Sequence, residues 1–506
     1  MIFEETTKEV VHDYSEDIIE NVWSLRSRIG SSTQVKESEG DGVWSTGDRG
    51  VFRSVLVSAI GRAHEVVCIS SFLMGEEEIE RALLSAVARG VRVYILSVPD
   101  VILDREEAIM GEEERVDERA EEYKAFLNHI AGKMLLRAAS HFHSKFLLVD
   151  LKDSSHMEGY LSTANFNKAL VEGVELGVRL TPSEIHGVFQ QFVRGFWVEA
   201  SQELRHKGRL SPVSSHPKDL AIPTKVDGVL TTIASRNSDI KTLQEGIVEF
   251  LEQTEGPVYL SMFGFEEGHA VLSAITNHAK EREITVLTRL RPSFRQIRAL
   301  NELVDAGVTI LGHERLHAKA IVSKMQGEPV ALVMTANLQS RGMDEGYETG
   351  VLLRGRRAQR VEEILNQWTE EFPWIFQGEA KLGELLGPIW LSIENNFTKT
   401  AVEEEKTIDG GVILIKSLDI DPVKMIPERR TRSKDEFYHR VKVTYHLKPP
   451  LVPAMTKRIN DDVSPLPLYK TDKNTFIAVK NEKELQSAIW LKDQRYPNAL
   501  IVVEGK

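Results

Sequence analysis

The pattern of apolar and polar positions predicts a strand–helix–strand unit that occurs twice along the chain. In the first occurrence, an apolar run at 66–72 precedes an amphipathic helical pattern at 76–90 and a second apolar run at 91–96. The same order returns later in the chain, at 257–263, 267–281 and 284–288. Strands joined through a helix pair in parallel with a right-handed crossover, so the sequence predicts α/β sheets with helices outside.

A second repeated pattern follows each unit and carries polar residues. After the first unit comes a predicted strand with His143 and Lys145, and then a strand that ends in Thr163 and Asn165. The matching residues later in the chain are His317, Lys319, Thr335 and Asn337. Because residues two apart on a strand face the same side, each His–Lys pair is expected to share one face. Two copies of such a face can meet at a pseudo-twofold axis.

The repeat divides the chain into five segments. An acidic amphipathic pattern at 1–40 predicts an N-terminal helical segment and lacks the charge order of a signal peptide. The two lobes are expected at 41–205 and 228–377, joined by a Pro- and Ser-rich surface linker at 206–227. Residues 378–506 contain short β-like runs broken by Pro and Asp, which predict a small β-rich or α+β C-terminal accessory domain.

The first lobe contains an acidic insert. The spacing from Phe72 to His143 exceeds the spacing from Phe263 to His317 by 17 residues. The extra residues lie near 104–122, where ten Asp or Glu and three Arg give a local charge of −7. We interpret this insert as a solvated helical face, with a gating or DNA-mimicking role as the alternative.

The composition, with 42% hydrophobic and 27% charged residues among 506, is that of an ordinary globular protein. The net charge of −13 argues against a uniformly basic coat for nucleic acid, although it permits a local basic groove. Between 424 and 458, ten Lys or Arg stand against three acids. We expect this segment, with Arg429, Arg430 and Arg432, to contact nucleic acid, and a solvated basic loop is an equal alternative.

The single cysteine and the hydropathy pattern bear on the cellular compartment. Cys68 lies in an apolar run and cannot form an internal disulfide, which indicates a core residue in a reducing compartment. No run reaches the roughly 18 apolar residues that a membrane span requires. We therefore expect a cytoplasmic protein without integral membrane contact.

The duplicated polar cluster suits phosphoryl transfer. One neutral imidazole can attack phosphorus while a second, charged imidazole protonates the leaving oxygen. Lys and Asn side chains can hold the non-bridging oxygens as negative charge builds. Glu175 and Glu348 follow the two asparagines along the chain and can fix the imidazole tautomers. This chemistry needs no metal and no cofactor, and the pair of His141 and His143 lacks the further ligands of a zinc site.

These motifs resemble those of a known family. HFHSKFLLVD (141–150) with STANFN (162–167) resembles the H-x-K-x4-D motif and the following S-x-N signature of the phospholipase D superfamily. LHAKAIVS (316–323) with MTANLQ (334–339) resembles the second copy of that motif. The resemblance implies two similar phospholipase D-like lobes related by pseudo-twofold symmetry.

The resemblance also implies residue roles. One histidine forms a phosphohistidine, and the other acts as general acid and then as general base. We assign the nucleophile to His143, because Lys324 stands where the second motif expects the counterpart of Asp150. Phosphate binding falls to Lys145, Lys319, Asn165 and Asn337, and orientation of the imidazoles falls to Glu175 and Glu348. Substrate contacts are expected from Thr163, Thr335, Arg289 and Arg291.

The substrate is interpreted as nucleic acid, DNA in particular. Four arginines lie close to an aromatic residue at 288–298, and the basic segment 424–458 adds a second candidate surface. Resemblance to nucleases with an extra C-terminal domain implies a prokaryotic restriction or anti-phage system with an ATPase or helicase partner. The alternatives are a cytosolic or peripheral phospholipid phosphodiesterase or phosphatidyltransferase, and a catalytically weakened scaffold subunit that binds nucleic acid.

Overall fold

The computed structural model describes most of the first 381 residues and a set of short strands beyond them. The described residues are 18–26, 41–45, 50–98, 116–140, 142–205, 208–213, 228–235, 238–290, 294–381, 389–392, 412–415, 423–426, 441–443, 457–459, 468–470, 475–479 and 499–504. The chain divides into two compact units. The larger unit comprises Gly30–Arg289 and Ala306–Phe372, and the smaller one comprises Met1–Ile29, Leu290–Asp305 and Pro373–Lys506.

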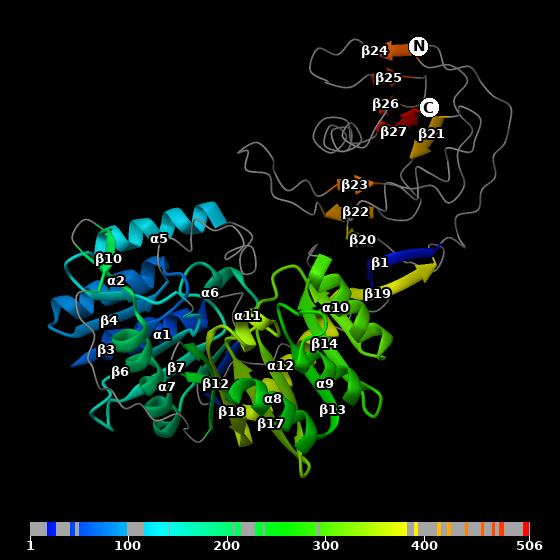
Figure 1. The fold of residues 1–506 in the computed structure, drawn as a ribbon. Coiled ribbons are helices and arrows are strands. Elements are labelled where there is room, and N and C mark those ends of the chain that lie inside the picture. Colours follow the sequence, from blue (N-terminus) through cyan, green and yellow to red (C-terminus); the bar gives the residue numbers. More distant parts are fainter. Residues whose placement is uncertain are drawn as a thin grey trace. The chain divides into compact units, whose positions relative to one another are not determined.

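The first lobe of the larger unit is built on one mixed sheet. Its strands are β2 (Val43–Ser45), β3 (Val66–Ser70), β4 (Arg92–Ser97), β5 (Leu135–Ala138), β6 (Phe146–Val149), β7 (Glu158–Ser162), β8 (Leu176–Arg179), β9 (Gln202–Leu204) and β10 (Leu210–Pro212). They lie in the order β10-β9-β5-β4-β3-β6-β7-β8-β2. Figure 1 labels β10, β4, β3, β6 and β7 of this sheet. β3, β4 and β5 run parallel, whereas β6 is antiparallel to β3. The predicted strand–helix–strand unit at 66–96 is therefore present.

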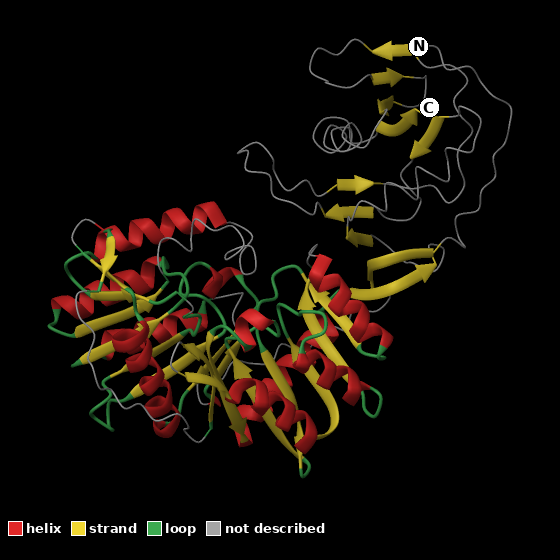
Figure 2. Cartoon of the chain, viewed as in Figure 1, coloured by secondary structure: helices red, strands yellow, loops and turns green. Residues whose placement is uncertain are grey.

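Helices flank this sheet (Figure 2). They are α1 (Val51–Arg62), α2 (Glu77–Ala88), α5 (Val116–Ile130), α6 (Ala169–Glu172), α7 (Pro182–Arg194) and the π-helix η3 (Gly195–Glu199). α7 begins at a capping box, in which Thr181 and Glu184 satisfy each other's backbone N–H groups. Phe52 of α1 and Phe126 of α5 join one hydrophobic core with the sheet, which fixes the strand ends that carry the polar motifs.

The second lobe belongs to the same unit and repeats this layout. Its strands are β11 (Val229–Ser235), β12 (Ser238–Lys241), β13 (Glu255–Ser261), β14 (Ile284–Arg289), β15 (Thr309–His313), β16 (Ala320–Met325), β17 (Glu328–Met334) and β18 (Tyr347–Arg354). They lie in the order β12-β11-β18-β17-β16-β13-β14-β15, with β13, β14 and β15 parallel. The helices are α8 (Thr242–Gln253), α9 (Ala270–Ala279), α11 (Ser340–Met343) and α12 (Gly355–Glu371). The α/β class predicted from the sequence is confirmed.

The smaller unit is mainly β-structure. β1 (Ile18–Leu25) pairs antiparallel with β19 (Trp374–Lys381) and with β20 (Ile389–Ser392). One helix of this unit is α10 (Phe294–Asp305). β22 (Val423–Ile426) pairs with β20 and with β23 (Val441–Val443). A five-stranded sheet contains β21 (Val412–Ile415), β24 (Lys457–Ile459), β25 (Leu468–Lys470), β26 (Thr475–Val479) and β27 (Ala499–Glu504).

The predicted N-terminal helix at 1–40 is wrong for residues 18–25, which form strand β1. Val22 and Trp23 of this strand are buried, and Trp23 packs against Phe376 of β19. Asn21 has a φ of 57°, and the register with β19 continues unchanged across it, from Glu20 opposite Glu379 to Val22 opposite Gln377. Pairing with residues more than 300 positions away decided the conformation against the local helical pattern.

Three other predicted boundaries can be compared with the structure. The linker predicted at 206–227 contains β10, which pairs with β9 and so extends the first sheet. The boundary predicted between 377 and 378 falls inside β19. Within the acidic insert, residues from Val116 onward start α5, and 99–115 lie outside the described residues.

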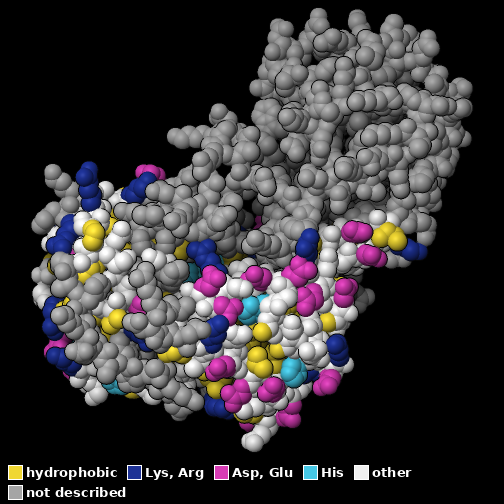
Figure 3. Space-filling view, in the orientation of Figure 1, with side chains coloured by type: hydrophobic (Ala, Val, Ile, Leu, Met, Phe, Trp, Pro, Cys, Tyr) yellow, Lys and Arg dark blue, Asp and Glu magenta, His cyan; other side chains and the backbone are white. Residues whose placement is uncertain are grey.

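The face drawn in Figure 3 carries both signs of charge on its coloured residues. On the face in Figure 3, Lys and Arg side chains are scattered among Asp and Glu over the coloured part of the molecule. This mixture agrees with the net charge of −13 and with the absence of a uniformly basic coat on the coloured residues of that face.

Candidate active site

The first histidine motif lies in an extended segment just before β6, rather than within that strand. The backbone N–H groups of His143 and Ser144 both donate to the carbonyl oxygen of Tyr347, each at 3.0 Å. Tyr347 begins β18 of the second lobe, and its ring stacks on Phe142 with the centroids 4.7 Å apart. The backbone of the first motif is therefore held by the second lobe.

The second motif is held in the same way by the first lobe. The N–H groups of His317 and Ala318 donate to the carbonyl oxygen of Val174, at 3.0 and 2.9 Å. Val174 immediately precedes Glu175, just as Tyr347 immediately precedes Glu348. Both histidine motifs consequently lie at the boundary between the two lobes.

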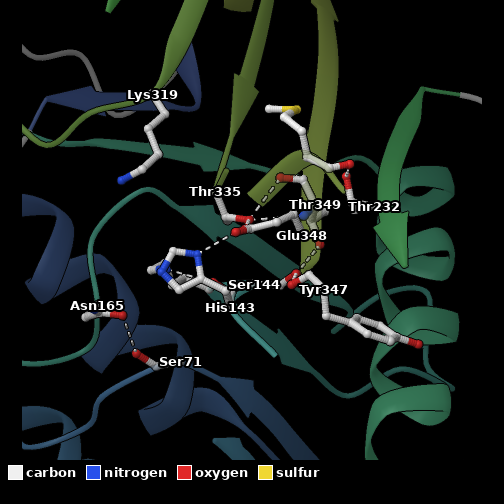
Figure 4. A network of polar contacts seen from close by, with 12 residues as sticks. Ser71, His143, Ser144, Asn165, Thr232, Lys319, Thr335, Tyr347, Glu348 and Thr349 are labelled. Atoms are coloured by element: carbon white, nitrogen blue, oxygen red, sulfur yellow. Dashed lines mark hydrogen bonds and ion pairs between the residues drawn. The ribbon is translucent and has the colours of Figure 1, made fainter. Parts of the chain in front are cut away.

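Each histidine ring binds a glutamate from the opposite lobe. His143 Nδ1 lies 2.7 Å from Glu348 Oε1 (Figure 4). His317 Nδ1 lies 2.6 Å from Glu175 Oε1. Both carboxylates are buried, so little water competes for these contacts. Sequence reasoning found both glutamates and left open which histidine each one meets.

Two threonines hold the second oxygen of these carboxylates. Thr163 Oγ1 donates to Glu175 Oε2 at 2.6 Å, and Thr335 Oγ1 donates to Glu348 Oε2. Each Thr oxygen also accepts a backbone N–H from the residue that follows the glutamate. Both threonines are fully buried behind the carboxylates. In the structure, the two threonines orient the glutamates, whereas the sequence predicted that they contact the substrate.

The motif lysines lie against the other nitrogen of each histidine ring. Lys145 Nζ is 2.7 Å from His143 Nε2, and Lys319 Nζ is 3.1 Å from His317 Nε2. An ammonium group can only donate, so Nε2 accepts in both contacts. The proton of each neutral imidazole then sits on Nδ1 and is donated to the glutamate. Figure 4 shows the Lys319 ammonium directed toward the space beside His143 and Asn165.

An asparagine and two phenylalanines complete the surroundings of the rings. Asn165 Oδ1 lies 3.4 Å from Ser71 Oγ, and Asn337 is likewise buried. Phe72 meets the His143 ring edge-on at 5.3 Å between centroids, and Phe263 meets the His317 ring at 4.6 Å. From the sequence, these two phenylalanines served as landmarks only. Their matching position, two residues after β3 and two residues after β13, was the signal that could have assigned them to the site.

The predicted substrate arginines are only partly described. Arg289 ends β14, is buried, and places Cζ 5.6 Å from the centroid of the Phe263 ring. Arg289 therefore joins the His317 side of the site. The remaining predicted positions, His141, Arg291, Arg429, Arg430 and Arg432, lie outside the described residues.

Asp150 does not join the cluster. It follows β6 at the end away from His143, and its carboxylate accepts the backbone N–H groups of His64, Glu65 and Val66 at 2.8 to 3.1 Å. It therefore ties the turn between α1 and β3 to β6. Lys324, which replaces the corresponding aspartate, consequently does not weaken the contact between His317 and Glu175.

One polar network distinguishes the two half-sites. Behind Glu348, Thr349 Oγ1 contacts Ser144 Oγ at 2.8 Å and the amide oxygen of Gln191 on α7. In the other half, the matching positions of Ser144 and Thr349 are Ala318 and Leu176. The contact between β18 and the first lobe is thus polar, and its counterpart is apolar.

Metal ligation and membrane spans can be judged for the described part of the chain. No group of three or more His, Cys, Asp or Glu side chains is arranged there to hold a metal ion. No helix in the same part is long and apolar enough to cross a membrane.

Comparison with known proteins gives one family match. Residues 56–197 match a family model described as cardiolipin synthase, phospholipase D-like domain. Among curated proteins, none matches the chain.

Several solved structures are similar at low scores. A polyphosphate kinase from Porphyromonas gingivalis matches with 14% identity and a TM-score of 0.40, over 62% of this chain and 44% of the kinase. A phosphatidylserine synthase from Haemophilus influenzae Rd KW20 matches with 12% identity and a TM-score of 0.43, over 72% of this chain and 90% of the synthase. Nuc from Salmonella typhimurium, a phospholipase D family member, matches with 21% identity and a TM-score of 0.25, over 32% of this chain and 97% of Nuc. The matched region spans less than half of the kinase.

Proposed function

The chain belongs to the phospholipase D superfamily through residues 56–197, and from this premise we propose that it is a metal-independent phosphodiesterase that cleaves DNA. The observation that carries the proposal is the pair of histidines at the lobe boundary. Each has a glutamate of the other lobe at Nδ1 and a lysine ammonium at Nε2. This arrangement supplies a nucleophile, a proton donor and charge for the phosphate in one place.

In the first step, His143 attacks phosphorus through Nε2. Because its Nδ1 proton is donated to Glu348, the Nε2 lone pair can form the N–P bond. Lys145 and Lys319 move from the Nε2 atoms to non-bridging phosphate oxygens, where they stabilise the charge of the transition state. Once Lys319 has left, His317 takes up a second proton at Nε2. The bond between phosphorus and the leaving oxygen breaks, and charged His317 donates this Nε2 proton to that oxygen.

In the second step, water releases the retained fragment from His143 as a phosphomonoester. Neutral His317 accepts a proton from a water molecule, and the water oxygen attacks phosphorus. The N–P bond breaks, and His143 is restored as a neutral imidazole. Glu175 supports the positive charge that His317 carries before the first step and regains in the second.

We also propose that the two lobes are related by a pseudo-twofold axis that passes between the histidines. The recurrence of each contact supports this symmetry: the carbonyl oxygen that holds each motif, the glutamate at each Nδ1, and the threonine behind each glutamate. A single phosphate on such an axis would meet both histidines.

DNA is the proposed substrate because a buried arginine adjoins the site. Arg289 and His317 both contact the ring of Phe263. The guanidinium therefore adds positive charge beside the histidine, where the next phosphate of a polynucleotide would lie. We extend the proposal to a cytoplasmic protein of a prokaryotic restriction or anti-phage system that works with an ATPase or helicase. Arg291 and the residues at 429–432 are proposed as further nucleic-acid contacts.

The second candidate function is that of a phospholipid phosphodiesterase or phosphatidyltransferase. The description of the matching family, cardiolipin synthase, favours it. The same two-step chemistry would apply, with an alcohol in place of water as the second acceptor.

The test of the proposal is hydrolysis of bis(p-nitrophenyl) phosphate in EDTA. We expect the parent protein to be active, His143→Ala to lose about three orders of magnitude or more, and the exposed-site control Lys152→Ala to match the parent. Full activity in His143→Ala, or activity that requires added Mg²⁺, contradicts the mechanism. Parallel assays with single-stranded DNA and with phosphatidylglycerol vesicles distinguish the two candidate substrates.

A further inference from the structure

The two lobes differ at the ends of two matched strands. β14 and β15 end in Arg289 and His313, which are neighbours across the parallel pair. Arg289 stands as far after Phe263 as Val98 stands after Phe72, and His313 precedes His317 by the same spacing as Ala139 precedes His143. The first lobe thus has Val98 and Ala139, both buried, where the second lobe has a cation and an imidazole.

The guanidinium of Arg289 lies close to the reacting groups of the second lobe. Its Cζ is 5.6 Å from the centroid of the Phe263 ring, and that ring meets His317 at 4.6 Å. Lys319 Nζ lies 5.4 Å from the same ring centroid. Arg289 is only 8% exposed, so a charge that it binds would interact strongly.

His313 adds a hydrogen-bond donor beside this guanidinium. Burial lowers the pKa of His313, and the nearby Arg315 and Arg289 lower it further. The imidazole is therefore neutral near pH 7. Its Nδ1 accepts the backbone N–H of Arg315 at 3.1 Å, so the ring proton is on Nε2 and can be donated.

We propose that Arg289 and His313 form a subsite for a second phosphate, the one next to the scissile diester on the leaving-group side of a polynucleotide. The inference rests on the proposed phosphodiesterase function. A guanidinium binds phosphate oxygens with two parallel hydrogen bonds, and the imidazole N–H provides a third donor. His317 protonates the leaving oxygen in that mechanism, so the adjoining subsite contacts the departing fragment.

The subsite makes the two sides of the active site different for a bound polynucleotide. The apolar side chains of Val98 and Ala139 offer no donor to a phosphate on the other side. Of the two phosphates that flank the scissile diester in a polynucleotide, only the one on the leaving-group side would therefore be bound. A diester with a phosphate only on the retained side would gain nothing from Arg289.

The experiment compares three thymidine dinucleotides: TpT, pTpT with a 5′-terminal phosphate, and TpTp with a 3′-terminal phosphate. For the parent protein, we expect one terminal phosphate, and not the other, to raise kcat/KM by about 10- to 100-fold over TpT. Arg289→Val and His313→Ala, which install the first-lobe residues, should reduce that ratio toward one. Arg289→Lys should retain part of it, because the charge remains without the two parallel bonds. The exposed α2 control Arg81→Gln should keep the parent ratio.

The outcomes separate this inference from the proposed function. If the parent protein does not hydrolyse bis(p-nitrophenyl) phosphate, the proposed phosphodiesterase function is wrong. Activity on that ester with equal rates on the three dinucleotides, or an unchanged ratio in Arg289→Val, would overturn the subsite alone. An effect of Arg289→Val that arises with phosphatidylglycerol vesicles and not with dinucleotides would overturn the polynucleotide assignment.

Discussion

At the scale of single residues, the two glutamates divide the work of the site between the lobes. Glu348 orients the proposed nucleophile, and Glu175 supports the histidine that must carry charge. We predict that Glu348→Gln slows phosphoenzyme formation by about 10- to 100-fold, because the amide no longer stabilises the charged phosphohistidine. Rapid-quench kinetics with a nitrophenyl ester measures this step directly.

Glu175→Gln is the matched comparison for that measurement. A nitrophenolate leaving group needs little protonation, so this variant should slow the later, water-dependent step and spare the first one. Equal slowing of both steps in both variants would contradict the division of roles.

Cys68 provides a second prediction at this scale. Burial raises the pKa of its thiol to about 12, against the opposing charge of Arg92. Because the thiolate is the reactive form, we expect no reaction of the native protein with a disulfide reagent at pH 8. The thiol should titrate once the protein is unfolded in urea. Rapid reaction of the native protein would show that the assignment of Cys68 to the core is wrong.

At the scale of secondary-structure elements, Asp150 joins β6 to the turn before β3. Its carboxylate accepts three backbone N–H groups, and its φ of 50° lies in the left-handed region. We predict that Asp150→Ala lowers the free energy of unfolding by about 3 kcal/mol, since it leaves these donors without their acceptor. Urea denaturation measures the change.

Asp150→Asn serves as the control for this change. Asparagine keeps one acceptor oxygen and tolerates the left-handed conformation, so it should be less destabilising than alanine. A large fall in kcat with unchanged stability in Asp150→Ala would instead assign this residue to the chemistry.

The sequence predicted the elements well where local pattern and burial agree. The apolar runs that became β3, β4, β13 and β14 were recognised because their residues are buried within parallel strands. The amphipathic pattern likewise identified α2. Residues 18–25 were predicted as helix because the stabilising partner, β19, lies far away in the chain.

The sequence predicted which residues form the site more completely than it predicted how they contact one another. Motif spacing identified the histidines, lysines and glutamates. It could not show that each glutamate crosses to the other lobe, because that contact depends on how two sheets pack. For the same reason, Thr163 and Thr335 were expected to bind substrate, although their hydroxyls lie behind the carboxylates.

At the scale of the whole molecule, the basic segment 424–458 is predicted to increase the affinity for DNA and to take no part in catalysis. Arg429, Arg430 and Arg432 lie outside the described residues, so this prediction rests on the sequence. Neutralising all three should weaken DNA binding and reduce the log–log salt slope by about one for each phosphate that the protein no longer neutralises. Fluorescence anisotropy at several salt concentrations measures both effects.

Hydrolysis of bis(p-nitrophenyl) phosphate is the control for this triple variant. The small ester needs only the histidine site, so its rate should remain that of the parent. An unchanged DNA affinity and salt slope would show that the basic segment does not bind DNA.

The measurement that tests the central claim most directly is the trapping of a phosphoenzyme in His317→Ala. With bis(p-nitrophenyl) phosphate, this variant should release a burst of nitrophenol equal to the enzyme concentration, because the first step proceeds and the general base for the second is missing. Mass spectrometry of a digest should then find an acid-labile p-nitrophenyl phosphoryl group on the peptide that contains His143, because only one of the two ester bonds breaks in the first step. Absence of the burst, or this group on any other residue, would contradict the assignment of His143 as the nucleophile.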